Sequence, residues 1–342
     1  MKAMLLKNLG PLSETTAPLV PGTLPRPVPK PAELLVRVTA CGVCHTELDE
    51  IEGRTPPPRL PIVPGHQIVG RVEACGEDVR KFESGDRVGI GWIFSACGRC
   101  PQCLAGRENL CPEFRATGRD ENGGYAEYMT VPEDFAYAVP DIFTDTEAAP
   151  LLCAGAVGYR SLKLTGLEDG QNLGLTGFGA SAHLVLQMAK HRFPNSSVFV
   201  FARSEHERAF AMELGAAWSG DTEDTAPEKL DGIIDTTPAW KPIIEGLRNL
   251  APGGRLVINA IRKEEFDKDQ LQRLDYSTHL WMEKEIKSVA NVSRDDVTEF
   301  LKLAAGIPIK SQIEEYPLEN ANEALRALKA GRIRGAKVLR IA

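Results

Sequence analysis

Four cysteines lie close together in the stretch CGRCPQCLAGRENLC, at Cys97, Cys100, Cys103 and Cys111. Four thiolates from one short loop are the donor set of a tetrahedral zinc site with no open position, the type that has a structural role. Thiolates bind as anions, so a metal held there organises the loop and contributes folding free energy. We predict a structural zinc; an iron–sulfur cluster, which also uses four cysteines, and four free or paired thiols are the alternatives.

A second group of metal-ligand residues is spread over the first half of the chain. The segments TACGVCHTELDE and LPIVPGHQIVG supply cysteines and His66, and Cys153 follows in LLCAG. Two cysteines and a histidine give three protein ligands, and three ligands plus water is the arrangement of a catalytic zinc. Taken singly, His66 is interpreted as a hydrogen-bonded core or loop residue, and Cys153 as a small core hydrophobe.

A glycine-rich turn stands in the second half of the chain. GLTGFGASAH places Gly177, Gly179 and Ala182 as G-x-G-x-x-A after an expected strand and before an expected helix. The first glycine permits a tight turn, the second lets the backbone approach a pyrophosphate, and the small third residue lets helix and strand pack closely. Turn-forming glycines also occur by chance, but this placement between strand and helix predicts a dinucleotide site.

The end of the next strand bears on which dinucleotide binds. An NAD site usually has an acidic residue there that accepts from the ribose 2′-OH. Here SVFVFARSEHE continues into Arg203 and Ser204, which we expect to hold a 2′-phosphate, so we predict NADP over NAD. In the alternative, Arg203 is a solvated loop residue and Glu205 or Glu207 replaces the missing acid.

The elements expected around these residues are of two kinds. Residues 1 to about 150 carry short β-like runs between turn signals, such as LLVRVTA and QIVGRVEA, and predict an all-β unit built as a distorted barrel. EAAPLLCAGAVGYRSLKLTG then has helical spacing and ends at Gly166. Strand and helix alternate afterwards (QNLGLT, ASAHLVLQMAKHR, SVFVFA, SEHERAFAMELG), which predicts a parallel sheet with helices on both faces.

Length and composition fit such a protein. The chain has 342 residues, enough for two domains, with 43% hydrophobic and 25% charged residues. A net charge of −7 argues against a nucleic-acid surface. The N-terminal apolar run is too short for a signal peptide, and no run approaches the about 18 residues of a membrane helix. We expect a cytoplasmic location, where thiols stay reduced and clustered cysteines are more often metal ligands than disulfides.

Together these segments resemble the zinc-dependent medium-chain alcohol dehydrogenase family. GVCHT, the GH segment, the C-x2-C-x2-C-x7-C loop, LLCAG and the G-x-G-x-x-A turn stand in family order and spacing, over nearly the whole chain. The resemblance implies that Cys44, His66 and Cys153 hold the catalytic zinc and that the four clustered cysteines hold the structural one. It also implies a GroES-like distorted β-barrel catalytic domain, residues 1–151 and 290–342, with a Rossmann cofactor-binding domain at residues 152–289.

The resemblance also implies roles for residues near the catalytic zinc. Thr46 matches the family's Ser/Thr that bonds the substrate oxygen and starts a proton relay through the nicotinamide ribose. His45 matches a residue that contacts the cofactor pyrophosphate. Glu47 falls where the family usually has an Asp that orients the zinc-binding histidine. Trp92 matches a position that commonly lines the substrate pocket; a core tryptophan is the alternative.

Three positions depart from the pattern. Gln67 stands where many relatives have Glu after the zinc-binding histidine, which removes a negative charge near the metal. Asp49 stands where the relay often ends in His; an exposed Asp is a weak base near neutrality, so the relay is expected to end at bulk water, and a histidine-like limb in the pH–rate profile that vanished in a His45 variant would indicate His45 as its end instead. Ile51 stands where some ethanol-specific relatives have a bulky Trp, which predicts a wider pocket for alcohols longer than ethanol.

The sequence therefore predicts a zinc-dependent alcohol dehydrogenase or aldehyde reductase. It would carry out reversible hydride transfer between a primary alcohol, medium-chain or aromatic, and NADP, with NAD as the alternative cofactor and two zinc ions per chain. A polyol, formaldehyde or cinnamyl-type dehydrogenase of the same fold is one alternative function. A non-catalytic zinc- and dinucleotide-binding protein is another. The family also suggests a homo-oligomer, a tetramer or a dimer.

Overall fold

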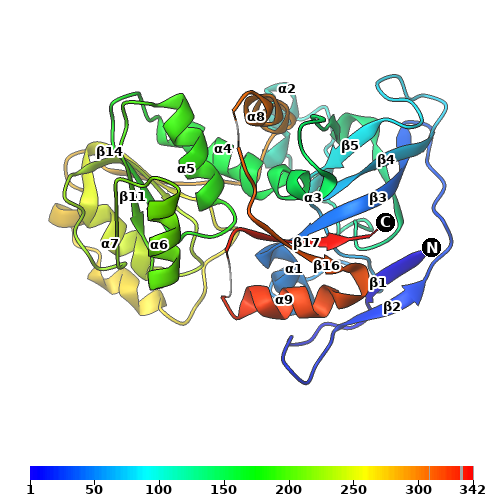
Figure 1. Ribbon diagram of the computed structural model, residues 1–342, viewed down its shortest axis with the longest axis horizontal. Coiled ribbons are helices and arrows are strands. Elements are labelled where there is room, and N and C mark those ends of the chain that lie inside the picture. Colours follow the sequence, from blue (N-terminus) through cyan, green and yellow to red (C-terminus); the bar gives the residue numbers. More distant parts are fainter. Residues whose placement is uncertain (308, 332–333, 342) are drawn as a thin grey trace. The chain divides into compact units, whose positions relative to one another are not determined.

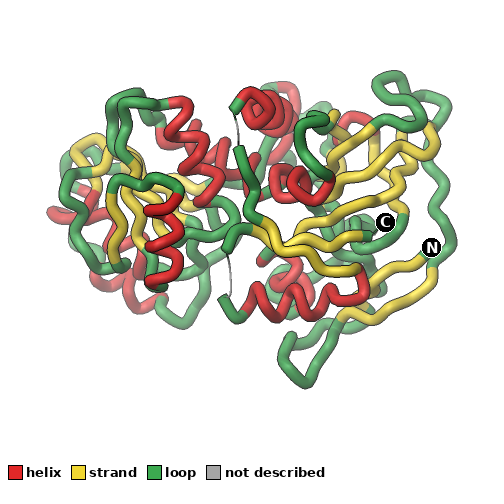
Figure 2. Tube along the Cα trace, in the orientation of Figure 1, coloured by secondary structure: helices red, strands yellow, loops and turns green. Residues whose placement is uncertain are grey.

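The computed structural model describes residues 1–307, 309–331 and 334–341, and the chain divides into two compact units. Unit 1 comprises Met1–Cys153, Ser293–Ala305 and Lys310–Ala342; unit 2 comprises Ala154–Val292 and Gly306–Ile309. Each unit has a main sheet of its own (Figure 2). Among the described residues, no helix combines the length and the apolar character needed to cross a membrane.

Unit 1 is built on a β-sheet that, within the described residues, has seven strands and is mostly antiparallel (Figure 1). The strand order is β16-β17-β3-β4-β5-β9, and β8 also pairs with β3. The strands are β3 (Glu33–Val43), β4 (Ile68–Cys75), β5 (Arg87–Ile90), β8 (Tyr128–Pro132), β9 (Ala136–Ala138), β16 (Ile313–Pro317) and β17 (Ala336–Arg340). Smaller sheets pair β1 (Lys2–Leu6) with β2 (Leu19–Thr23), and β6 (Ile93–Ser95) with β7 (Arg115–Ala116). The expected β-rich first half is confirmed.

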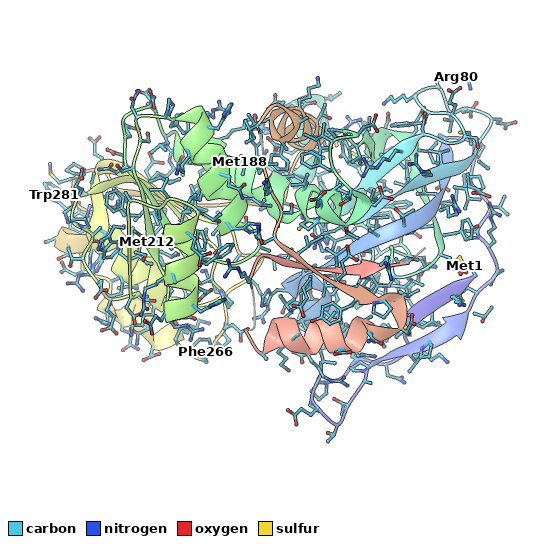
Figure 3. All side chains as sticks on the ribbon, in the orientation of Figure 1. Met1, Arg80, Met188, Met212, Phe266 and Trp281 are labelled. Carbon is cyan, nitrogen blue, oxygen red and sulfur yellow. The ribbon has the colours of Figure 1, made fainter. Side chains whose placement is uncertain are left out.

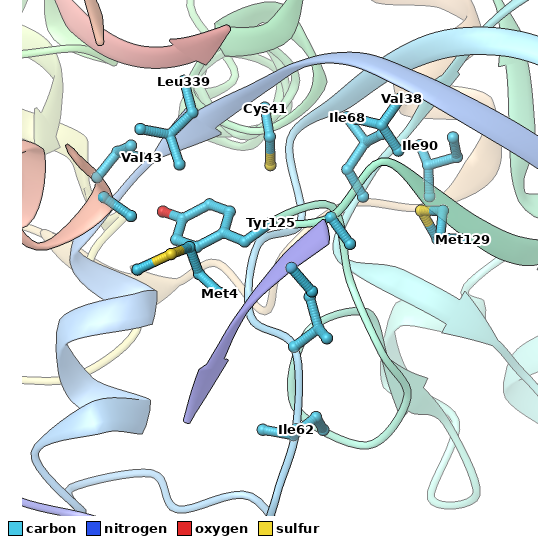
Figure 4. Packing of buried hydrophobic residues seen from close by; sticks show 14 of the residues in the cluster. Met4, Val38, Cys41, Val43, Ile62, Ile68, Ile90, Tyr125, Met129 and Leu339 are labelled. Carbon is cyan, nitrogen blue, oxygen red and sulfur yellow. The ribbon is translucent and has the colours of Figure 1, made fainter. Parts of the chain in front are cut away.

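The core of unit 1 lies against these strands (Figure 4). Val36 and Val38 on β3 are fully buried while Arg37 between them is exposed, the alternation of a strand with one face on a core. Tyr125 is fully buried, and a Cβ at Gly65 would lie 2.4 Å from its ring. Only glycine fits here, because Gly65 also has a φ of +99°, and this close packing fixes the backbone that leads into His66.

The helices of unit 1 are short apart from two. They are α1 (His45–Ile51), α2 (Pro101–Leu104), α3 (Asp145–Ala148), α8 (Arg294–Gly306) and α9 (Ala321–Lys329). The helical run expected up to Gly166 is broken: α3 ends at Ala148, a 3-10 turn covers Ala149–Leu152, and α4 (Ala154–Thr165) begins afterwards. Cys153 stands at the break with non-helical angles, φ −132° and ψ −75°. The helical pattern gave no sign of this break.

Unit 2 contains a parallel sheet with the strand order β12-β11-β10-β13-β14-β15 in its described part. The strands are β10 (Leu173–Thr176), β11 (Val198–Phe201), β12 (Trp218–Gly220), β13 (Leu230–Asp235), β14 (Leu250–Ile258) and β15 (Glu285–Ser288). The helices are α4, α5 (Ala182–Arg192), α6 (Glu205–Glu213) and α7 (Lys241–Asn249), and α4 to α7 pack on the sheet strands. The parallel sheet predicted from the alternation of strands and helices is confirmed, and it has the Rossmann arrangement that the family resemblance implies.

The strand order of unit 2 reverses direction next to β10. The chain runs outward from β10 through β11 to β12, then returns to β13 on the other side and continues to β14 and β15. In open parallel sheets, ligands bind beyond the carboxyl ends of the strands at such a switch point. The glycine turn follows β10, so the topology places it at this position.

Candidate metal and cofactor sites

Three donors from separate segments of unit 1 converge. Cys44 follows β3, His66 precedes β4, and Cys153 stands at the break before α4. Their ligand atoms all lie within 4.8 Å of one another, and His66 Nε2 is 3.3 Å from Cys153 Sγ. Two sulfurs and one imidazole nitrogen fit a zinc ion and leave a fourth position for a further ligand.

Glu47 fixes the geometry of two of these donors. Cys44 is the N-cap of α1, its Sγ accepts a bond from the N–H of Thr46 at 3.3 Å, and one Glu47 oxygen accepts from the N–H of Cys44 at 2.8 Å. The other Glu47 oxygen is hydrogen-bonded to His66 Nδ1, so Nδ1 carries the proton and Nε2 is left as a metal donor. Glu47 and His66 are almost fully buried. The longer Glu side chain therefore makes the contact that the family's Asp is expected to make.

Thr46 brings a hydroxyl to the same group. Its Oγ1 lies 3.4 Å from Cys44 Sγ, and the residue is 7% exposed. If the three donors held a metal, this hydroxyl would stand beside it as a candidate hydrogen-bond partner for a substrate oxygen.

Two buried ionisable side chains close to the three donors, Glu50 and Tyr125, were not predicted from the sequence as part of this site. Glu50 is 1% exposed, and burial, followed by the charge of Glu47, raises its pKa well above the ordinary value. Burial also raises the pKa of Tyr125, with Glu47 the next cause. A bound dication would oppose both shifts, because it favours negative charge nearby. Glu50 precedes Ile51 on α1, and only the folded structure shows that it points inward.

The four-cysteine loop forms a closed donor set. It connects β6 to β7 and contains α2 and the 3-10 turn Glu108–Leu110. The four Sγ atoms lie within 4.8 Å of one another. Backbone N–H groups donate to sulfur, from Cys100 to Cys97 at 3.4 Å and from Cys103 to Cys100 at 3.5 Å. Four sulfurs with such bonds fit a structural zinc that has no open position.

The glycine turn of unit 2 has the geometry of a ligand cradle. Gly177 has a φ of +75°, and a Cβ there would lie 2.9 Å from Thr237 Cγ2 and 3.0 Å from Thr236 Oγ1. A side chain is therefore excluded both by the backbone angle and by the neighbouring loop. Ala182 starts α5 and is fully buried. The turn fits a dinucleotide phosphate group at the start of a helix.

His183 supports the turn from beneath, which sequence reasoning missed. Its Nδ1 is 3.0 Å from the carbonyl oxygen of Gly179. Burial lowers the pKa of His183 to about 4, so the imidazole is neutral at pH 7 and Nδ1 is the donor. The available signal in the sequence was a histidine directly after the motif, in an expected apolar helix.

The residues that were predicted to select the dinucleotide lie just beyond β11, after the buried Ala202. Arg203 and Ser204 both face solvent, and the described part of the chain offers no hydrogen bond or ion pair to the Arg203 side chain. Arg208 instead supports the backbone, donating from Nη1 to the carbonyl oxygens of Ala202 at 2.8 Å and Arg203 at 3.1 Å. The Arg203 guanidinium is thus available to an anionic ligand.

The positions that depart from the family pattern are placed as follows. Asp49 is 4% exposed and accepts from Arg54 Nε at 2.6 Å, so the expectation of an exposed proton acceptor is wrong. Ile51 is fully buried in the core of unit 1, and its effect on substrate size stays a prediction. Gln67 is 2% exposed, whereas His45 is exposed.

Trp92 occupies an aromatic cluster. It is 8% exposed, its ring centroid is 5.1 Å from that of Phe114, and the Arg119 guanidinium lies 5.5 Å from its ring. Most of the Trp92 side chain is therefore buried, as expected for a core tryptophan.

The fold and the sites define a class of protein. A β-rich unit with an open three-donor site, joined to a parallel sheet with a glycine cradle at its switch point, is the architecture of a dinucleotide-dependent oxidoreductase.

Comparisons with known proteins narrow this class. Residues 30–141 match the family described as "Alcohol dehydrogenase GroES-like domain". The chain is 43% identical to the "Probable alcohol dehydrogenase AdhA" of Mycobacterium tuberculosis, over 100% of this chain and 97% of that protein. It is 36% identical to an "Alcohol dehydrogenase" of Geobacillus stearothermophilus, over 90% and 92% of the two chains. A cinnamyl alcohol dehydrogenase from Sorghum bicolor superposes with a TM-score of 0.85 at 28% identity, covering 99% of this chain and 97% of that one. The chain belongs to the zinc-dependent medium-chain alcohol dehydrogenase family.

Proposed function

We propose that this chain is a zinc-dependent alcohol dehydrogenase that also works as an aldehyde reductase, with unit 1 as the catalytic domain and unit 2 as the cofactor-binding domain. The observation that carries the proposal is the convergence of Cys44, His66 and Cys153 beside the hydroxyl of Thr46. A metal held by these donors would supply a Lewis acid for the substrate oxygen, and the nicotinamide would accept or donate the hydride.

The residues of the chain have separate tasks in this scheme. Thr46, whose Oγ1 lies 3.4 Å from Cys44 Sγ, would take up the substrate proton at that hydroxyl. Glu47 keeps His66 in the tautomer that leaves Nε2 free. Asp49 is engaged by Arg54, so the proton leaves toward solvent or through the exposed His45 and not through Asp49.

We propose NADP as the preferred cofactor, held at its 2′-phosphate by Arg203 and Ser204, with Gly177, Gly179 and Ala182 at the pyrophosphate and His45 as a further cofactor contact. The Arg203 guanidinium supports this choice, because it is exposed and forms no ion pair with another described residue, so it is available to bind a phosphate. NAD is the alternative, in which Glu205 or Glu207 accepts from the ribose.

We propose two zinc ions per chain, with the second at Cys97, Cys100, Cys103 and Cys111. The donor chemistry of each group supports this. The reduced thiolates that both sites require favour a cytoplasmic location. A homo-oligomer is supported by the large apolar side chains exposed on unit 2, including Phe266 at 71% and Trp281 at 55% (Figure 3).

The substrate proposed is a primary alcohol or its aldehyde, of medium chain length or aromatic. Similarity to a cinnamyl alcohol dehydrogenase favours a cinnamyl-type substrate as a second candidate. The test is to follow nicotinamide absorbance with hexanal, benzaldehyde and cinnamaldehyde, with NADPH and NADH side by side. Turnover of at least one aldehyde with NADPH preferred is expected. Binding of dinucleotide with no turnover of any aldehyde or alcohol would return the chain to a non-catalytic role.

A further inference from the structure

A buried ion pair stands at the carboxyl edge of the sheet in unit 2. Asp235 ends β13 and is fully buried, and the side chain of Lys263, which follows β14, is 6% exposed. Lys263 Nζ is paired with Asp235 Oδ2 and donates to the carbonyl oxygens of Thr237 at 2.7 Å and Ala239 at 3.0 Å. An ammonium has three donors, and all three are used.

The other oxygen of Asp235 ties β10 to the same network. Asp235 Oδ1 accepts from Thr176 Oγ1 at 2.6 Å and from Thr237 Oγ1 at 2.8 Å. Thr176 is the last residue of β10, directly before Gly177. The pair therefore joins the ends of β10 and β13 to the segment after β14, which are consecutive in the sheet order.

This network holds the loop that forms one wall of the glycine cradle. Thr236 donates to the carbonyl oxygen of Thr176 through its N–H at 3.0 Å and its Oγ1 at 2.9 Å. Thr236 and Thr237 are the residues that a Cβ at Gly177 would strike. Lys263 binds this loop at two carbonyls, and the N–H of Glu264 adds a bond to Pro238 at 2.7 Å.

The position of the pair relative to a bound dinucleotide follows from the topology. The ribose carrying the 2′-group lies at the end of the strand after the glycine turn, here β11, on one side of β10. The pyrophosphate crosses the turn, so the nicotinamide half lies on the other side, over the ends of β13 and β14. Asp235 is the last residue of β13, and Lys263 lies in the segment that follows β14.

The buried Lys263–Asp235 pair is not explained by a gain in folding stability. Removing two charges from water is costly, and replacing a buried pair with apolar residues is often neutral or stabilising. A fully bonded pair that joins three strand ends instead restricts the loop between them to one conformation.

We propose that Lys263 and Asp235 are positioning residues for the nicotinamide half of the cofactor. They hold the loop Thr236–Ala239 in the conformation that receives the nicotinamide riboside, without touching the reacting atoms. The inference rests on the proposed dinucleotide function and extends it to a part of unit 2 outside the glycine motif.

The test compares two ligands by titration calorimetry with the full-length protein. NADPH carries the nicotinamide, whereas 2′-phospho-ADP-ribose lacks it. Lys263→Met is expected to weaken NADPH binding about tenfold while changing 2′-phospho-ADP-ribose binding less than about twofold. The double variant Lys263→Met with Asp235→Asn leaves no uncompensated charge and retains an acceptor for Thr176, so it serves if the single variant does not fold.

Lys284→Met is the matched control. Lys284 Nζ also donates to two main-chain carbonyls, those of Leu247 and Thr278 at 2.9 Å each, but it precedes β15 and so stands at the amino edge of the sheet. It should change neither affinity. Equal weakening of both ligands by the Lys263 variants, or no change in either, would overturn the inference. If the wild type prefers NADH, the proposed cofactor preference fails separately, and NADH with ADP-ribose tests the pair in the same way.

Discussion

Replacement of Arg203 by alanine should change which dinucleotide the protein prefers. Arg203 stands after β11, is exposed, and is not engaged by another described residue. A hydrogen bond to a charged group contributes about 1.5–3 kcal/mol, and solvent screening at an exposed site reduces this to roughly 1–2 kcal/mol. That range corresponds to a loss of about 5- to 30-fold in kcat/KM with NADPH. NADH has no 2′-phosphate, so its kcat/KM should stay within about twofold.

The assay is initial-rate reduction of one aldehyde with each cofactor, at low ionic strength and at about 0.15 M. The wild-type preference for NADPH should shrink as salt rises, and Arg203→Lys should retain most of it because the charge remains. Arg208→Ala is the control for backbone damage, because Arg208 supports the carbonyls of Ala202 and Arg203 and should affect both cofactors. An equal loss with NADPH and NADH in Arg203→Ala would refute the reasoning.

Three further predictions concern other residues. Thr46→Val should lower kcat by about 100-fold or more while Thr46→Ser retains most activity, measured with the metal content unchanged; equal activity of both variants would exclude the hydroxyl. Cys103→Ser should remove one zinc per chain and expose the Cys97–Cys111 loop to proteolysis, whereas an intact loop would contradict a structural metal. His183 has a pKa of about 4 when folded and about 6.5 when unfolded, so its contribution to stability is complete above about pH 6.5 and is lost as pH falls toward 4. His183→Asn should therefore flatten the pH dependence of the unfolding free energy by up to about 3 kcal/mol between pH 7 and 4, and an unchanged slope would show that His183 is not buried and neutral.

Local sequence patterns predicted the donors and the cradle because their chemistry depends on spacing. The four cysteines follow one another in a single loop, and the glycine turn needs only its own backbone angles and the adjacent strand and helix. Donors far apart in the chain, such as Cys44 and Cys153, were paired by resemblance to a family, since no local pattern joins them.

Other features depend on tertiary contacts that the sequence pattern does not contain. The break at Cys153 interrupts a segment with helical spacing, and only the folded chain shows where the 3-10 turn begins. Asp49 was expected to be exposed, but it is buried and pairs with the exposed Arg54. Lys263 and Asp235 are separated along the chain by α7 and β14, so nothing in either segment alone indicates a buried pair.

The claim that the three converging donors hold a catalytic metal can be tested by counting zinc in matched variants. Wild-type protein should contain about two zinc ions per chain, one for each donor group. Cys153→Ser should contain one and lose aldehyde reduction while retaining its fold and its affinity for NADPH. Cys75→Ser, which replaces an exposed cysteine outside both groups, should keep both ions and full activity. A Cys153→Ser protein that kept two zinc ions and turned over aldehyde at the wild-type rate would contradict the account.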